Sequence, residues 1–360
     1  MRLYLYERSV TKREHVLSLP FELTVRQQRS SRFLCDCLDQ GKNAFLQAVC
    51  GSGKTEITLA AIMLALSRGM RIGFAICRKQ IVIQLERRFR SYFPQSVVKA
   101  VYEEHKDDKG AHLVIMTIQQ LINYRSEFAL IIVDEADGFP YADSSYYTRL
   151  TTKALCPGGL RFLLSATIKQ ADRAALAQDG FLFHLNPERF HSADHDIPRF
   201  QFVPEETTAA MMAALVPICR TWLADAKPML VFAPTVQVAE RIAKALSEGG
   251  FPAVALTSKT SNKEAILARF RDGVAKIIVA TTILERGVTF SNVQVCVIYA
   301  DHRLFTAPTL IQIAGRVGRD ATEPRGEIRF LSVHISKAMR AAKREIIAIN
   351  RRKNAGVIFG

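Results

Sequence analysis

Short apolar runs rich in β-branched residues alternate with longer segments in which apolar residues recur at helical spacing. Strands buried on both faces of a parallel sheet read as continuous apolar runs, so this alternation predicts repeated strand and helix units. In the first half of the chain the predicted strands are Ala44–Val49, Ile72–Cys77, His112–Thr117, Ala129–Asp134 and Arg161–Ser165. In the second half they are Met229–Ala233, Ala253–Thr257, Lys276–Thr281, Gln294–Tyr299 and Glu327–Val333.

The alternation stops in the stretch HSADHDIPRFQFVPEETT and then starts again. Pro198 and Pro204 flank a short extended piece there, and we interpret residues 198–206 as a linker. A chain of 360 residues exceeds one compact core. We therefore predict two α/β domains, each a mostly parallel sheet flanked by helices, over residues 21–197 and 207–360, after an N-terminal extension over 1–20. A cleft between two such domains is the expected ligand site.

The charge of the chain points to polyanionic partners. Lys and Arg number 49 against 34 Asp and Glu, which gives a formal net charge of +15 and favours nucleic acid or an acidic membrane surface. The stretch ISKAMRAAKREIIAINRRKN carries one acid, Glu345, among seven cations: Lys337, Arg340, Lys343, Arg344, Arg351, Arg352 and Lys353. Two interpretations fit this stretch, a helix that faces nucleic acid or a solvated helical face.

The seven cysteines form no CxxC pair, which favours a reducing compartment and argues against a disulfide framework or a structural zinc site. The opening stretch MRLYLYERSVTKREH lacks the apolar core of a signal peptide, and no apolar run approaches the length of a membrane span. We therefore expect a cytoplasmic protein.

The stretch AVCGSGKTE lies between a predicted strand and the predicted helix EITLAAIMLALSRG, the context of a phosphate-binding loop. Gly51, Ser52 and Gly53 would wrap backbone N–H groups around phosphate oxygens at a helix N-terminus, where the dipole favours anions. Lys54 would reach the β and γ phosphates, and the Thr55 hydroxyl would ligate magnesium. The full pattern has glycine at the first position, where this chain has Ala48. The predicted cofactors are ATP and magnesium.

Two further stretches belong to the predicted nucleotide site. In FALIIVDEAD, an apolar strand ends at Asp134 and Glu135, which places the carboxylates at the C-terminal edge of a parallel sheet. Asp134 would hold magnesium and Glu135 would orient or deprotonate the attacking water. In ELTVRQQ, the amide of Gln27 could read the adenine edge. Gln28 and a plain surface glutamine remain alternatives.

The remaining motifs lie at predicted strand ends and in the second half of the chain. Ser165 and Thr167 follow a strand, and ATTILERGVTF offers Thr281, Thr282, Glu285, Arg286 and Gly287. In QIAGRVGRD, Arg316 and Arg319 are three apart, so on a helix they would share a face, with Gln312 a turn earlier. We interpret them as arginine fingers that complete a split site.

This ordered set of motifs resembles the core of a superfamily 2 helicase with two tandem RecA-like domains, over nearly the whole chain. Within that superfamily, TTILERGVTF followed by QIAGRVGRD is most similar to the ComFA family of late competence ATPases, implicated in DNA import during bacterial transformation. The replication-restart helicase PriA is the next nearest relative. ComFA proteins usually carry a four-cysteine zinc module, whereas the only close pair here is Cys35 and Cys37, so no structural zinc is expected.

The resemblance implies a role for each motif. Lys54, Thr55, Asp134, Glu135, Arg316 and Arg319 would take the hydrolytic roles, with Gln312 in the same motif. Glu285 and Gly287 would contribute to the nucleotide site. A third set would couple hydrolysis to nucleic acid or touch its backbone: Arg78, Thr117, Ser165, Thr167, Thr281, Thr282 and Arg286.

The leading functional hypothesis is an ATP-driven motor that translocates on single-stranded DNA during DNA uptake. One alternative is a strand-separating helicase of replication restart, repair or RNA metabolism, with RNA in place of DNA. Another is an ATP-switched nucleic-acid-binding component of a larger assembly. Further expected partners are the DNA-uptake machinery at the inner face of the membrane and, equally compatible with the sequence, other copies of the chain in an oligomer.

Overall fold

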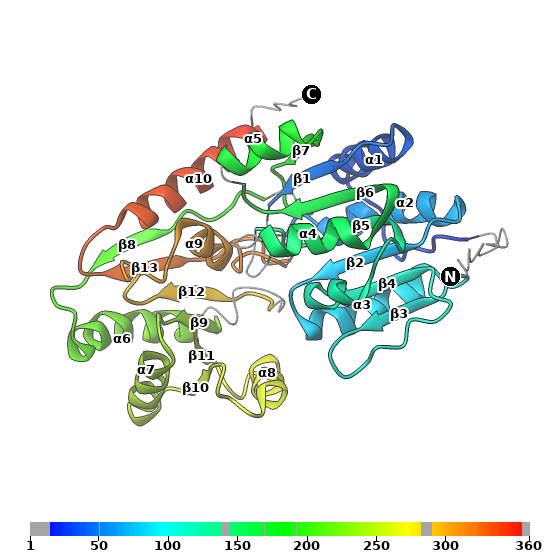
Figure 1. Ribbon diagram of the computed structural model, residues 1–360. Coiled ribbons are helices and arrows are strands. Elements are labelled where there is room, and N and C mark those ends of the chain that lie inside the picture. The colour runs from blue at the N-terminus through cyan, green and yellow to red at the C-terminus, as the bar shows by residue number, and fades with distance from the viewer. Residues whose placement is uncertain are drawn as a thin grey trace. The chain divides into compact units, whose positions relative to one another are not determined.

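The computed structural model describes residues 15–49, 51–137, 141, 145–168, 170–191, 193–281, 290–320 and 322–354. The chain forms two compact units, which meet in the sequence between Asn186 and Pro187. Each unit contains one parallel sheet with helices on both faces, which confirms the predicted fold class (Figure 1).

Unit 1 is built on a seven-stranded sheet in the order β3-β4-β2-β5-β6-β1-β7, and every neighbouring pair is parallel. Crossovers therefore join its strands, as the sequence pattern predicted. The strands are β1 (Ala44–Ala48), β2 (Ile72–Ile76), β3 (Val98–Val101), β4 (Leu113–Thr117), β5 (Phe128–Val133), β6 (Leu155–Ser165) and β7 (Leu182–Asn186).

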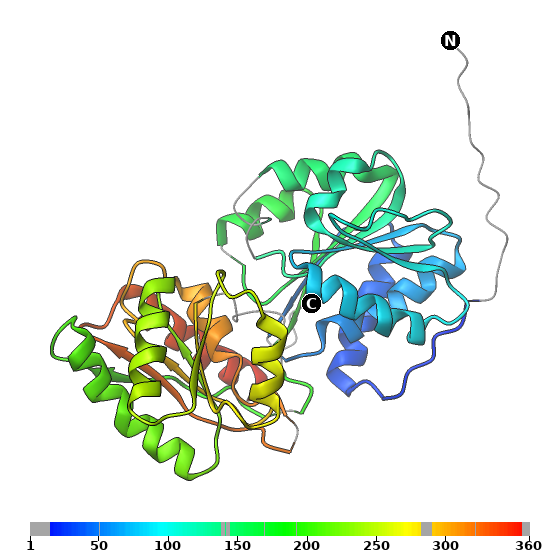
Figure 2. The same ribbon diagram turned by 90° about the horizontal axis from the view of Figure 1, so that it is seen from below.

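Alternate residues of these strands point to opposite faces of the sheet, and helices cover both faces (Figure 2). On one face, Leu46 and Phe74 pack against α1 (Val25–Asp39), α2 (Lys54–Ser67) and α3 (Lys79–Tyr92). On the other, Phe45 and Val133 belong to a core with the 3-10 helix η1 (Ile118–Asn123) and the helix α4 (Ser145–Ala154), against which α5 (Gln170–Gln178) packs through Leu176.

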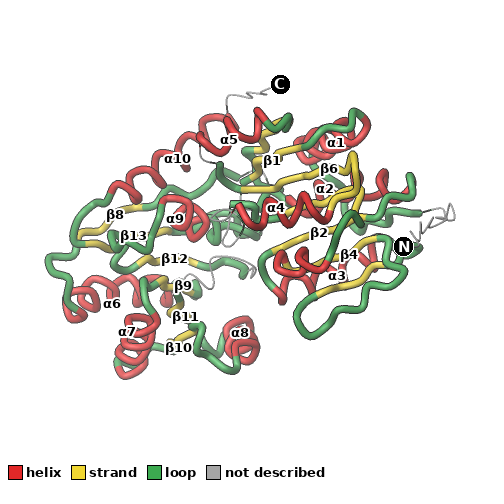
Figure 3. Tube along the Cα trace, in the orientation of Figure 1, coloured by secondary structure: helices red, strands yellow, loops and turns green. Residues whose placement is uncertain are grey.

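Unit 2 is built on a six-stranded parallel sheet in the order β10-β11-β9-β12-β13-β8 (Figure 3). Its strands are β8 (Arg199–Phe202), β9 (Met229–Phe232), β10 (Ala253–Leu256), β11 (Ile277–Ala280), β12 (Gln294–Val297) and β13 (Ile328–Ser332). One face packs against α6 (Thr208–Ala224) and α7 (Val236–Glu248). The other packs against α8 (Lys263–Arg271), α9 (Ala307–Ala314) and α10 (Lys337–Asn354).

The predicted domain limits differ from the observed units. The predicted linker, residues 198–206, contains β8, which pairs with β13 at the edge of the unit 2 sheet. An edge strand tolerates flanking prolines because one row of its backbone groups needs no partner, and this is why Pro198 and Pro204 were misinterpreted. At the other end, residues 15–20 lie within unit 1 and not in a separate extension. For example, the Ser18 N–H donates to the Tyr92 carbonyl at 2.9 Å.

Candidate nucleotide site and the arginine loop

Three motifs of unit 1 leave the sheet side by side. The strands β5, β6 and β1 are consecutive neighbours in the parallel sheet, so their carboxyl ends lie at one edge. The phosphate-loop residues follow β1, Asp134 follows β5, and Ser165 ends β6. The sheet order therefore brings the predicted phosphate, metal and coupling residues together.

The phosphate loop turns through two glycines with left-handed backbone, Gly51 at φ 80° and Gly53 at φ 76°. Gly53 is the N-cap of α2 and makes no side-chain capping bond, so the first N–H groups of the helix face the loop. The Lys54 ammonium donates to the carbonyls of Ala48 at 2.8 Å and Val49 at 3.3 Å. The Lys54 side chain thus lies beside the N-terminal end of α2, where the helix dipole favours an anion.

Gln27 braces this loop from α1. Its Oε1 accepts from the Thr24 N–H at 2.9 Å in a capping box, and its Nε2 donates to the Ser52 carbonyl at 2.9 Å. A Cβ on Gly53 would lie 2.4 Å from the same Nε2, so a side chain at this position would force the Gln27 amide to shift. Both ends of the amide predicted to read adenine are therefore engaged with the protein backbone, while Gln28 donates to the Leu23 carbonyl at 2.9 Å.

The acidic pair occupies a strained and buried turn. Asp134 is 6% exposed, and its Oδ1 accepts from the Glu135 N–H at 2.8 Å. Glu135 has φ 56°, which is uncommon for a residue with a side chain and is typical of functional turns. Burial and then the charge of Glu135 raise the pKa of Asp134 to about 7, and Lys54 opposes the rise. The positive charge near Asp134 is therefore too small to offset the cost of burying its carboxylate.

The Ser-Ala-Thr motif is bonded directly to the acidic motif. The Thr167 hydroxyl donates to Asp137 Oδ2 at 2.8 Å, and the Thr167 N–H lies 3.2 Å from the same oxygen. The Ser165 hydroxyl donates to the Thr167 carbonyl. Asp137 had no predicted role. Its position three residues after Asp134, in the same turn, was the signal that could have identified it.

The residues present fit a magnesium nucleotide. The Ser52 hydroxyl is fully buried and has no hydrogen-bond partner within the described ranges, and it lies in the loop whose N–H groups are open to an anion. A buried carboxylate with a raised pKa is the environment that a cation would stabilise. Magnesium needs few protein ligands because phosphates and water supply the rest, so the two predicted ligands Thr55 and Asp134 would be enough.

Two residues predicted to touch nucleic acid lie at the same edge of the unit 1 sheet. Arg78 is the N-cap residue of α3 after β2, and Thr117 ends β4 and is 8% exposed. Since β2 and β4 are neighbours, the two residues follow adjacent strands. Thr281 follows β11 in unit 2. Thr282, Glu285, Arg286 and Gly287 lie outside the described residues.

The helix predicted for GRVGR is wrong. α9 ends at Ala314 with Gly315 as its C-cap, and the chain turns again at Gly318, where φ is +63°. Two glycines weaken a helix, and a left-handed residue ends one, so Arg316 and Arg319 do not share a helical face. We name residues 315–320 the arginine loop.

The arginine loop holds its cations close to the C-terminal end of α9. Arg316 is 2% exposed, and Arg319 is half-buried and donates from Nε to the Gly315 carbonyl at 2.8 Å. Gln312 lies on α9 and is 4% exposed. The C-terminal end of a helix dipole favours positive charge, so the position suits arginines.

Two residues that the sequence analysis missed support this loop. Arg189 Nη1 and His191 Nε2 both donate to the Gly318 carbonyl, at 2.9 and 2.7 Å. Arg189 and His191 lie 129 and 127 positions before Gly318 in the sequence, so no local pattern could have shown these contacts.

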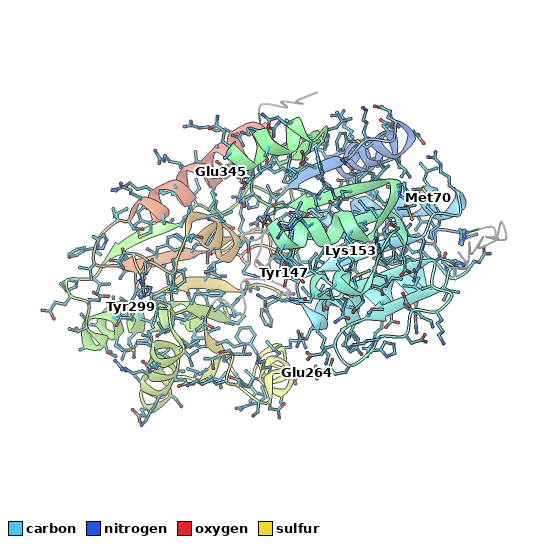
Figure 4. All side chains as sticks on the ribbon, viewed as in Figure 1. Met70, Tyr147, Lys153, Glu264, Tyr299 and Glu345 are labelled. Atoms are coloured by element: carbon cyan, nitrogen blue, oxygen red, sulfur yellow. The ribbon has the colours of Figure 1, made fainter. Side chains whose placement is uncertain are left out.

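The basic stretch near the C-terminal end forms α10. Its side chains divide between two faces: Lys343 lies over the Phe200 ring and Lys353 pairs with Asp194, while Glu345 (Figure 4) accepts from Arg352. A second set of cations is exposed and spaced three, four and seven positions apart along the helix, which places them on one side: Lys337, Arg340, Arg344 and Arg351.

No group of three or more His, Cys, Asp or Glu side chains is arranged to hold a metal ion within the part of the chain that the structure describes. The described cysteines are free, and burial raises the pKa of the Cys35 thiol to about 11 and that of Cys37 to about 12. Among the described helices, none combines the length and apolar character needed to cross a bilayer.

Comparison with known proteins identifies both units. The family model described as type III restriction enzyme, res subunit, matches residues 20–170, and the model of the helicase conserved C-terminal domain matches residues 210–321. The chain is 26% identical to the ATP-dependent DNA helicase RecG of Synechocystis over 84% of its length, but it covers only 38% of that protein.

The fold resembles that of solved helicases. Dbp5 of S. cerevisiae, in a structure bound to RNA and ADP BeF3, matches 91% of this chain and 92% of its own with a TM-score of 0.65 and 14% identity. This likeness confirms two RecA-like domains in tandem, and with the family models it identifies an ATP-hydrolysing enzyme of the superfamily 2 helicase type.

Two competence proteins match over most of the chain. The chain is 32% identical to competence protein ComFA of Streptococcus pneumoniae, over 99% of this chain and 83% of that protein. It is 30% identical to competence protein ComFA of Bacillus subtilis, over 91% of this chain and 72% of that protein. The chain therefore belongs to the ComFA family of competence proteins.

Proposed function

We propose that this protein is an ATP-driven motor that translocates along single-stranded DNA during DNA uptake in competence. The observation that carries the proposal is the likeness to two competence proteins along nearly the whole chain. The net charge of +15 supports a polyanionic track.

The proposed hydrolytic site divides its work between the two loops. Lys54 binds the β and γ phosphates, Thr55 and Asp134 would hold magnesium, and Glu135 orients or deprotonates the attacking water. Bound magnesium would neutralise charge on the phosphate oxygens. Arg316 and Arg319 neutralise charge on the transferring phosphoryl group, and Gln312 supports them.

The bond between Thr167 and Asp137 offers a route from hydrolysis to DNA. Asp137 lies three residues after the proposed magnesium ligand Asp134, and Thr167 lies in the Ser-Ala-Thr motif at the end of the neighbouring strand. A change at the phosphate end thus reaches a motif proposed to act with Arg78 and Thr117 on the DNA backbone. Among the residues outside the described ranges, Thr282 and Arg286 are proposed to contact DNA, and Glu285 and Gly287 the nucleotide.

The exposed cations of α10 are proposed as an additional contact with the DNA backbone. Lys337, Arg340, Arg344 and Arg351 present a row of positive charge on one side of the helix, which matches the regular charge of a phosphate backbone. The proposed location is the cytoplasm, at the inner face of the membrane where DNA-uptake machinery would be the partner.

The test is the ATPase rate measured in parallel with single-stranded DNA, duplex DNA and RNA at one stated salt concentration. Single-stranded DNA should stimulate the rate most, and the protein should displace a block from the end of a labelled single strand. Glu135→Gln should bind ATP and lose both activities, since general-base catalysis is worth roughly 10²- to 10⁴-fold. A rate indifferent to nucleic acid would contradict the motor function.

The relationship to RecG favours strand separation as a second candidate function, since RecG is named a DNA helicase. A fluorescent duplex with a single-stranded overhang distinguishes the two. A translocase should leave the duplex intact while hydrolysing ATP, whereas a helicase should release the labelled strand.

A further inference from the structure

A segment that begins directly after unit 1 in the sequence, residues 187–191 and 193–196, holds the arginine loop. The Gly318 carbonyl accepts from Arg189 Nη1 at 2.9 Å and from His191 Nε2 at 2.7 Å. A carbonyl oxygen has two lone pairs, so these bonds fill its hydrogen-bonding capacity. Arg189 is 2% exposed, so water does not compete for its hydrogen bond to the Gly318 carbonyl. The loop is therefore fixed at one backbone atom by two side chains.

The fixed atom lies between the two arginines of the loop. Gly318 follows Arg316 by two residues and precedes Arg319 by one. Its φ of +63° and the position of an added Cβ, 2.6 Å from Arg189 Nη1, show that the guanidinium lies directly against the backbone. Movement of Gly318 would shift both arginines, because the peptide units between them are rigid planes.

The segment is itself anchored to the body of unit 2. Arg189 Nη2 lies 3.0 Å from His195 Nδ1, and since a guanidinium cannot accept, that ring nitrogen carries no proton. The backbone N–H and carbonyl of His195 are both bonded to the Asn350 side chain of α10 at 2.9 Å. Lys353 of α10 pairs with Asp194 at 2.6 Å. These contacts connect α10 through Asp194 and His195 to Arg189, and Arg189 to the arginine loop. We name this series of contacts the brace.

A buried guanidinium is costly unless its charge is compensated, and Asp196 supplies a negative charge nearby. Burial raises the pKa of Asp196, and the charge of Arg189 lowers it, so the two groups interact. Along the chain, only Pro187 and Glu188 separate Arg189 from Asn186, whose carbonyl accepts from the Val49 N–H at 3.2 Å beside the phosphate loop. The brace therefore follows directly in sequence from a residue of the nucleotide unit.

We propose that Arg189 is a positioning residue for ATP hydrolysis, which fixes the Gly318 carbonyl and thereby orients Arg316 and Arg319. The proposal rests on the proposed role of these two arginines. It extends that role to a residue with no place in the recognised motifs. A merely structural arginine would support the stability of unit 2 without a specific effect on the rate of hydrolysis.

The test is Arg189→Met in the full chain, which keeps an apolar stem and removes the donors. The kcat should fall about 100-fold, as expected when reacting groups are misplaced by about 1 Å, with the nucleotide Kd unchanged. Hydrogen exchange of the peptide spanning residues 313–320 should accelerate. Arg189→Lys keeps the charge and one donor, so it should recover part of the rate.

The matched control is Arg71→Met. Arg71 is a partly buried arginine of unit 1 that pairs with Asp108 at 2.5 Å and with Glu127. It should lower thermal stability without slowing kcat or loosening residues 313–320. Suppose that Arg189→Met lowered thermal stability as much as Arg71→Met does and lowered kcat by no more than Arg71→Met does. The positioning role would then be overturned.

A double-mutant cycle separates this proposal from the function on which it rests. In a background that carries both Arg316→Ala and Arg319→Ala, Arg189→Met should have little further effect, because Arg189 acts through these two arginines. If that background is slow and Arg189→Met slows it by the same factor as it slows the parent, the positioning role alone is overturned. A background as fast as the parent would overturn the arginine role and this proposal together.

Discussion

The phosphate loop and the arginine loop are both glycine turns beside a helix end, and they are supported in different ways. The phosphate loop precedes the N-terminus of α2, and Gln27 supports it from 25 residues away. The arginine loop follows the C-terminus of α9 and is supported from 129 and 127 residues away. The proposed phosphate at the N-terminus of α2 and the arginines at the C-terminus of α9 each suit their helix end, since the dipole favours an anion at the first and cations at the second.

This difference shows that a functional loop can be encoded locally or in two distant places. The phosphate loop has its lysine, its glycines and its helix in one stretch. The arginine loop has its cations in one stretch and its backbone support in another. Substitutions in the phosphate loop should therefore change nucleotide binding, whereas substitutions in the arginine loop should change the rate of the chemical step.

The largest expected effect tests that division directly. Lys54→Ala should weaken nucleotide binding and abolish hydrolysis, because it removes the ammonium that we propose binds the phosphates. Arg316→Ala should leave the nucleotide Kd nearly unchanged and lower kcat by roughly 10³-fold or more, since an arginine finger acts on charge in the transition state. Titration with a fluorescent ATP analogue and steady-state ATPase assays measure the two quantities.

Arg220, an exposed arginine of α6 in unit 2, provides the control for the loss of one positive charge. Arg220→Ala should change neither quantity. If Arg316→Ala weakened nucleotide binding as much as Lys54→Ala does, the two loops would not have the separate roles that their construction suggests.

The next effect concerns charge balance at the phosphate end. The pKa of Asp134 is raised to about 7, roughly 3 units above its usual value, which corresponds to roughly 4 kcal/mol. Since folding favours the protonated form, stability from this group is fully present below about pH 4 and is lost as the pH rises to about 7. With EDTA present, Asp134→Asn should therefore be more stable than the parent at pH 8, and the difference should disappear toward pH 4.

Thermal unfolding across this pH range measures the effect. Asp107→Asn is the control, because Asp107 is exposed, bonded to Lys99, and has its pKa lowered. It should not gain stability at high pH. An Asp134→Asn protein less stable than the parent throughout the pH range would show that the carboxylate is compensated by contacts other than a bound cation.

Most of the fold and the phosphate loop could be predicted from the sequence. The features that could not be predicted are those that depend on residues far apart in the chain or on weak local patterns. The ten predicted strands all exist, and all except β10 are mostly buried apolar runs. β10 is an edge strand in which only Leu256 is buried, and its apolar sequence AVAL still allowed its prediction. The three missed strands, β3, β7 and β8, also lie at sheet edges, and each carries basic or polar residues within its four or five positions. These residues interrupt a short apolar run, so the pattern resembles a loop.

The same limit applies to the site. The phosphate loop could be predicted because spacing, glycines and helix lie in one stretch. The helix proposed for Arg316 and Arg319 is wrong, because Gly315 before the pair and Gly318 between them end the helix in spite of the spacing of three. Arg189 could not be found, since its partner is a backbone carbonyl and a backbone atom leaves no pattern of residue types.

A smaller effect compares two left-handed glycines, one from each loop. Gly53→Ala and Gly318→Ala both incur the left-handed cost of roughly 1–2 kcal/mol. A Cβ on Gly53 meets the movable end of Gln27, whereas a Cβ on Gly318 lies 2.4 Å from the Pro324 carbonyl oxygen, which is backbone. Overpacking should therefore add roughly 1–3 kcal/mol at Gly318.

Urea unfolding of each variant checks this difference. Gly273→Ala in unit 2 is the matched control, because its φ is +72° and an added Cβ meets nothing within 4 Å. It should show the left-handed cost alone. Equal destabilisation in Gly318→Ala and Gly273→Ala would mean that the arginine loop adjusts freely and that its support is weaker than the contacts suggest.

The smallest expected effect compares two amides that each make two bonds of 2.9 Å to their support. Gln27 bonds the Thr24 N–H and the Ser52 carbonyl, and Asn350 bonds the backbone of His195. Truncating either to alanine should cost about 1–3 kcal/mol. Gln27→Ala should raise the KM for ATP, and an accompanying loss of discrimination against GTP would support the predicted contact with adenine. Asn350→Ala should instead lower kcat by several-fold at an unchanged KM, because it loosens the brace and leaves the phosphate loop intact. If both variants changed the same kinetic parameter, the two loops would be a single mechanical unit, and the contrast in how each is supported would have no functional consequence.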